Sequence, residues 1–157
     1  MAQPCADDRA ASGLRHLRES TIECLEGVPL SIHLLLFRLA IASVFLPAGF
    51  LKLAGWESTI ALFQDEYKIP VLPPALAATM AASFEVGCSS LLIAGLATRF
   101  ATLPLLGQIL TIQLFVYPQA WHEHLVWGGI LLFLLTRGAG AVSLDHLVSR
   151  WLNGPRA

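Results

Sequence analysis

The sequence predicts an all-α membrane protein built around a bundle of four transmembrane helices. Of its 157 residues, 55% are apolar and only 13% are charged, whereas about a quarter of a soluble domain is charged. The mean hydropathy is +0.65, and the charged residues are absent from long stretches that short turns separate. A soluble all-α domain would need polar outward faces on its helices, and these stretches barely have them.

Four apolar stretches are expected to cross the bilayer, at about residues 30–53, 75–97, 100–117 and 121–136. About twenty residues span the hydrocarbon core, and the fourth stretch is adequate if the bilayer thins locally. Arg99 leaves only a tight turn between the second and third stretches, so those helices should be antiparallel neighbours. Pro47 and Pro104 lie inside two stretches and favour kinks, which membrane helices tolerate.

The ends of the chain are more polar. Residues 1–29 form a tail without the apolar core of a signal peptide. The tail is either a short amphipathic helix or a partly ordered segment. After a Gly-rich break, a second amphipathic helix is expected within the domain of residues 30–151, and residues 152–157 form the C-terminal tail. The apolar face of this second amphipathic helix would consist of Leu144, Leu147, Val148 and Trp151.

Basic residues predict the orientation. With four spans, both termini lie on one side of the membrane. That side collects Arg9, Arg15, Arg18, Arg99, Arg137, Arg150 and Arg156. The other side collects only Lys52 and Lys68. The positive-inside rule therefore predicts that both termini are cytoplasmic.

Charge and cysteine spacing exclude several classes of function. A net charge of −1 gives no basic face for nucleic acid. The three cysteines Cys5, Cys24 and Cys88 show no CxxC or metal-ligand spacing, so no disulfide framework is expected. The sequence also contains no Gly-rich phosphate loop and no nucleophile elbow. No cofactor can be identified from these patterns.

Arg38 and Glu85 lie inside the apolar stretches, where an unpaired charge is costly. Counting along each stretch places them at depths that differ by only a few ångströms, so we expect them to pair across the first two helices. The pair would be either a polar site, such as a proton relay or a contact to quinone or substrate, or a buried ion pair that fixes helix register.

Other polar residues have weaker claims. Lys52 and Arg99 lie at span ends, where long cationic side chains reach the headgroups. Gln108, Thr111 and Gln113 could line a cavity with Glu85 or hydrogen-bond between helices. His122, Glu123 and His124 form the densest cluster of metal-ligand residue types. However, two histidines two residues apart point in different directions on a helix, so an interfacial role is favoured over a metal site.

Several of these residues occur in a pattern that resembles the DoxX family of small bacterial membrane proteins. The family shows an arginine followed by Gly-x-x-Lys in its first helix, a mid-membrane glutamate, a Gly-Leu-x-Thr-Arg turn, and Gly-x-Gly before Ser-Leu-Asp. The matching residues are Arg38, Gly49, Lys52, Glu85, Gly95, Arg99, Gly138, Gly140 and Asp145.

The resemblance implies a multi-pass protein of the bacterial inner membrane, but no single chemistry. It favours an accessory or anchoring subunit of a redox or stress-response system that contacts quinone. If the protein is an enzyme, it would be one component of a quinone-linked oxidoreductase. Expected partners are the lipid bilayer, a soluble oxidoreductase or another membrane subunit, and a second copy of the chain. The alternative is a small transporter, or an export or assembly helper, that uses an intramembrane Arg–Glu site.

Overall fold

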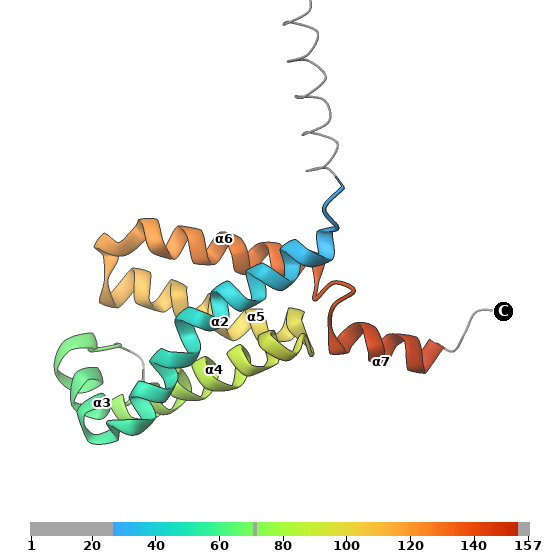
Figure 1. Ribbon diagram of the computed structural model, residues 1–157. Coiled ribbons are helices and arrows are strands. Elements are labelled where there is room, and N and C mark those ends of the chain that lie inside the picture. The colour runs from blue at the N-terminus through green and yellow to red at the C-terminus, as the bar shows by residue number, and fades with distance from the viewer. Residues whose placement is uncertain (1–26, 71, 154–157) are drawn as a thin grey trace, which may run out of the picture. The chain divides into compact units, whose positions relative to one another are not determined.

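The computed structural model describes residues 27–70 and 72–153, and every regular element in this part of the chain is helical (Figure 1). Contacts divide the chain into residues 1–30 and residues 31–157, and the description below concerns the second unit together with the helix that begins at Leu30. The expected amphipathic segment in the N-terminal tail lies outside the described residues.

Four long helices form the framework of this unit. They are α2 (Leu30–Ala54), α4 (Pro74–Ala94), α5 (Thr98–Thr111) and α6 (Trp121–Arg137). The connections contain α3 (Trp56–Leu62), the π-helical turn η1 (Phe63–Tyr67), a second π-helical turn η2 (Ile112–Val116) and the 3-10 turn η3 (Pro118–Ala120). The chain ends in α7 (Leu144–Asn153).

Within the described part of the chain, three helical stretches are long and apolar enough to cross a membrane, namely Leu30–Ala54, Pro74–Ala94 and Thr98–Val116. The last of these joins α5 to η2. Helix α6 has 17 residues, or about 25 Å at 1.5 Å per residue, which is short of a full hydrocarbon core. The protein is therefore of the membrane type, while the fourth span and the cytoplasmic termini stay predictions.

The helix ends follow from local chemistry. Pro74 stands in the first turn of α4, where its missing N–H costs nothing. Gly95 ends that helix in the left-handed conformation with φ +67°, which glycine adopts without a steric penalty. Pro47 and Pro104 lie inside α2 and α5, and neither interrupts its helix.

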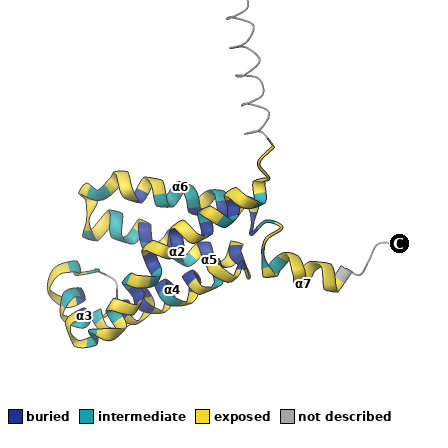
Figure 2. Cartoon of the chain, in the orientation of Figure 1, coloured by how far each residue is buried: buried dark blue, intermediate teal, exposed yellow. Residues whose placement is uncertain are grey.

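Packing separates an inner layer from an outer surface. Fully buried aliphatic residues from all four long helices form one cluster, including Ile41, Leu92, Leu105, Leu131 and Leu134. In Figure 2 the buried stretches of the long helices lie mainly where the helices face one another, and their outer sides are mostly exposed. The exposed residues include large apolar side chains such as Leu51 and Phe100, as expected of helices that face lipid.

Candidate functional site

Glu85 is the centre of a polar cluster inside the helices. Its carboxylate accepts hydrogen bonds from Lys52 Nζ at 2.8 Å to Oε1 and 2.7 Å to Oε2. Gln108 Nε2 donates to the same Oε1 at 2.5 Å. The Glu85 side chain is 3% exposed and that of Lys52 is 18% exposed. One buried carboxylate thus joins α2, α4 and α5.

The expected ion pair between Arg38 and Glu85 is wrong. Glu85 binds Lys52 instead, while Arg38 Nη2 donates to the backbone oxygen of Val142. The error lies in the relative register of the two helices. A Cβ on Gly49 would lie 2.8 Å from the Glu85 Cβ, so Glu85 is level with Gly49, which is eleven residues, or about 16 Å, beyond Arg38.

Gly49 explains how Lys52 reaches Glu85. A Cβ at position 49 would lie 2.7 Å from Val86 Cγ2 and 3.1 Å from the Val86 backbone nitrogen, both too close for a real side chain. Glycine therefore lets α2 and α4 approach closely at this point. Lys52 follows about one turn later and lies on the same side of α2. Its ammonium is therefore directed at Glu85, which differs from the expected extension toward the headgroups.

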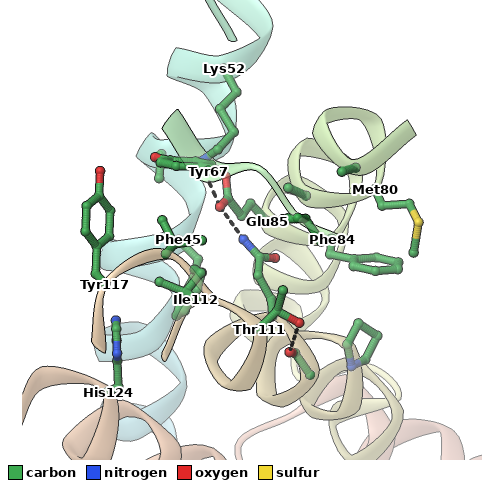
Figure 3. A pocket seen from close by; sticks show the side chains of 18 of the residues that line it. Phe45, Lys52, Tyr67, Met80, Phe84, Glu85, Thr111, Ile112, Tyr117 and His124 are labelled. Carbon is green, nitrogen blue, oxygen red and sulfur yellow. Dashed lines mark hydrogen bonds and ion pairs between the residues drawn. The ribbon is translucent and has the colours of Figure 1, made fainter. Parts of the chain in front are cut away.

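The Lys52–Glu85 pair forms part of the wall of a cavity of about 520 Å³. Residues of α2, η1, α4, α5, η2 and α6 line it, and most of this lining is apolar. Figure 3 shows Lys52 and Glu85 linked beside the rings of Phe45 and Phe84. The volume lies within the range of about 300–1,000 Å³ that is usual for small-molecule sites.

The two π-helical turns meet at this cavity. Phe63 and Tyr67 of η1, and Ile112 and Val116 of η2, all belong to its lining. The rings of Tyr67 and of Tyr117, which follows η2, make an edge contact at 5.8 Å between centroids. Such turns within helices occur frequently at functional sites.

Tyr67 and Tyr117, which line the cavity, form a second polar group with Glu66. Tyr117 donates its hydroxyl to Glu66 Oε1 at 2.6 Å, and this bond, together with a smaller effect of burial, raises the pKa of Tyr117 above its usual value. Burial raises the pKa of Tyr67 too, opposed by a hydrogen bond with Tyr117. Both phenols are therefore protonated and available as hydrogen-bonding groups at neutral pH.

Gln113 and His124 pair with each other. His124 Nδ1 is 2.7 Å from Gln113 Oε1, and Gln113 Nε2 donates to the Pro118 backbone oxygen. His124 is buried and lines the cavity together with Gln108, whereas Gln113 lines a separate groove between α5 and α6. Of the two glutamines considered from the sequence, Gln108 is thus the one at the main cavity.

The segment of metal-ligand residue types is spread over different surroundings. His122 is exposed and stacks on Trp121 at 3.7 Å between ring centroids. Glu123 is exposed at the cavity, and His124 is held by Gln113. Within residues 27–70 and 72–153, no three His, Cys, Asp or Glu side chains are placed to hold a metal ion together.

Arg38 belongs to a second cluster, near the N-terminal end of α5. Its side chain is 1% exposed, and its Nε and Nη1 atoms have no hydrogen-bond partner among the described residues. A Cβ on Gly95 would lie 1.7 Å from Arg38 Nη1, so only glycine fits there. Asp145, which attracts Arg38 electrostatically, accepts the backbone N–H groups of Ala97 and Thr98 at 2.8 and 3.2 Å.

The remaining motif residues surround this cluster. Gly138 and Gly140 both have φ +80°, in the region that favours glycine. Arg99 is exposed and donates from Nη2 to the Thr136 backbone oxygen at 3.3 Å. The sequence motif therefore divides into two sites, one around Glu85 and one around Arg38, separated by the buried aliphatic cluster.

Comparison with known proteins identifies a family and one relative. The family described as DoxX matches residues 33–118, more than half of the chain. An uncharacterized protein of Haemophilus influenzae is 28% identical over 136 residues, covering 80% of this chain and 89% of that protein. No solved structure was found to match the chain.

Proposed function

The chain belongs to the DoxX family, and we propose that it is an accessory subunit of a bacterial redox or stress-response system whose cavity binds quinone. The observation that carries the proposal is the apolar cavity with the Lys52–Glu85–Gln108 cluster in its wall. In this role the subunit holds the quinone within the membrane, and a partner oxidoreductase supplies the electrons that reduce it.

The cavity fits the shape and polarity of a quinone head group. Its volume of about 520 Å³ and its aromatic lining suit a flat ring. Val44 and Met80 belong to the lining and are about one third exposed, which supports an opening through which an isoprenoid tail could reach lipid.

The polar groups suit a neutral ligand with oxygen atoms. Lys52 and Glu85 neutralise each other, so a charged ligand would remain uncompensated. The Lys52 ammonium can donate to a carbonyl oxygen. Gln108 Oε1 is buried without a partner in the described structure, and such an acceptor suits the hydroxyl of a quinol, because an unsatisfied buried polar atom is costly. Bound quinone would supply the two-electron chemistry.

The transporter alternative has less support. Its Arg38–Glu85 site is not formed. Between Arg38 and the cavity lies the buried cluster that contains Ile41, Leu92 and Leu105, all at most 1% exposed. A transported substrate would have to cross this packed layer. The packing therefore favours a ligand that binds on one side of the cluster over a substrate that passes through the protein.

The topology is part of the proposal. Helix α6 would complete four spans, with both ends of the chain in the cytoplasm and the protein in the inner membrane. Single cysteines introduced at exposed Ser58 of α3 and exposed Ser149 of α7 test this in a variant lacking the native cysteines. A membrane-impermeant thiol reagent should label position 58 in whole spheroplasts and position 149 only after lysis. Equal labelling in both preparations would contradict the orientation.

Quinone binding is testable on the purified protein. A short-chain quinone titrated into detergent-solubilised protein should quench tryptophan fluorescence, because Trp127 lines the cavity. Glu85→Gln should weaken binding by about tenfold or more, equivalent to about 1.4 kcal/mol, by disturbing the Lys52 donor. Glu57→Gln is the matched control, since Glu57 is exposed and outside the cavity lining. Equal affinity of the two variants would refute the site.

A further inference from the structure

A second cavity, of about 490 Å³, lies where α5 begins and α6 ends. Arg99, Phe100, Arg137, Gly138, Asp145 and His146 are among its lining residues. We propose that this cavity binds the phosphate group of an anionic membrane phospholipid, held by Arg99 and Arg137. This proposal concerns a different cavity from the quinone site and does not depend on it.

The charge of the cavity favours an anion. Arg99 and Arg137 each bring a positive charge to the lining. The lining also includes Asp145, but its carboxylate accepts two backbone N–H groups and faces the buried charge of Arg38. The negative charge of Asp145 is therefore balanced from within the protein, which leaves the two arginines for a ligand.

The arginine side chains are also placed to bind. Arg99 donates one hydrogen bond, from Nη2 to the Thr136 backbone oxygen, whereas a guanidinium carries five N–H donors. A Cβ on Gly138 would lie 3.3 Å from Arg99 Nε, so the glycine leaves room for this side chain. The Arg137 guanidinium lies over the Phe133 ring at 5.9 Å. Guanidinium groups match phosphate oxygens in a bidentate geometry.

The position of the cavity favours a lipid as the source of the phosphate. Phe100 is 76% exposed and Leu103 is 51% exposed, and both lie on α5, just beyond Arg99. Since α5 is part of a stretch apolar enough to cross a membrane, its first turn would stand at headgroup level. An arginine pair next to an exposed apolar face suits a ligand with a phosphate and acyl chains.

Thermal unfolding of the delipidated, detergent-solubilised full chain tests the proposal. Phosphatidylglycerol should raise the melting temperature of the wild type, and phosphatidylcholine should have a much smaller effect. Each arginine should contribute about fivefold to the affinity for phosphatidylglycerol, so the double variant Arg99→Gln with Arg137→Gln should bind this lipid roughly 25-fold more weakly. Arg150→Gln is the control, because Arg150 lies on α7 outside the cavity lining.

Four results would overturn the proposal. One is that phosphatidylglycerol raises the melting temperature of the double variant as much as that of the wild type. Another is that Arg150→Gln loses as much affinity for phosphatidylglycerol as the double variant does. Equal protection of the wild type by phosphatidylcholine would exclude selectivity for anionic lipid. Equal protection by inorganic phosphate alone would assign the cavity to a free anion. If the double variant does not fold, Arg137→Gln alone decides the question by its expected fivefold loss of affinity for phosphatidylglycerol. This variant is suitable because the contact described for Arg137 lies within α6.

Discussion

Replacing Lys52 and Glu85 singly and together would measure the energy of the buried pair. Breaking one partner of a buried ion pair costs about 3–5 kcal/mol, and Lys52 keeps 18% of its side chain exposed, so Lys52→Met should cost about 3 kcal/mol. Glu85→Gln should cost about 2 kcal/mol, since the amide oxygen still accepts from Lys52. The double variant should cost about 3 kcal/mol, a coupling of about 2 kcal/mol.

The control is the same set of single and double substitutions at Arg38 and Glu85. These residues share no hydrogen bond or ion pair in the described structure, so the coupling between Arg38→Gln and Glu85→Gln should stay below about 0.5 kcal/mol. Reversible unfolding in mixed micelles, titrated with a denaturing detergent, gives the free energy of unfolding of each variant. Should Arg38→Gln prove too unstable to purify, Arg38→Lys serves the same comparison.

A larger coupling for Arg38–Glu85 than for Lys52–Glu85 would refute the register of α2 against α4. Equal costs of the double variant and of the summed single variants at Lys52 and Glu85 would also count against the account. In that case the two short distances would not correspond to a pair that stabilises the protein.

Two further predictions concern other parts of the structure. Gly95→Ala should destabilise the protein by about 3 kcal/mol, since it combines left-handed strain with displacement of Arg38. The control Gly87→Ala has no atom within 4 Å of the new Cβ and should be neutral or slightly stabilising. A larger loss of unfolding free energy in Gly87→Ala than in Gly95→Ala would contradict this. Because the pKa of Tyr117 is raised above its unfolded value of about 10, its bond to Glu66 stabilises the protein fully below that pH and is lost as pH rises further. Glu66→Gln should bring one tyrosinate absorbance transition to lower pH, and an unchanged titration would exclude the bond.

The positions of the long helices could be predicted because they follow from local properties of the sequence. The apolar stretch expected at 30–53 corresponds to a helix at Leu30–Ala54, and that at 121–136 to Trp121–Arg137. Length, hydropathy and turn residues are enough to place such segments. The π-helical turns were not predicted, because the residue types of FQDEY and IQLFV do not indicate a change in backbone hydrogen bonding.

The site could be predicted only in part, for a physical reason. Counting residues gives the depth of Glu85 within its own helix, but not which residue of α2 lies beside it. That register depends on the close contact at Gly49, a tertiary property. The signal was present in the Gly-x-x-Lys spacing, because a glycine at a helix crossing with a lysine one turn later places the ammonium beside the neighbouring helix.

Photoaffinity labelling with an azido-quinone tests the central claim most directly. After illumination of the protein in lipid nanodiscs, peptide mapping by mass spectrometry locates the attached label. We predict attachment to cavity residues of α4 and α5, such as Phe84 and Gln108, and competition by unlabelled quinone. Attachment confined to outward-facing residues such as Leu110 or Phe115, without competition, would contradict a quinone site in this cavity.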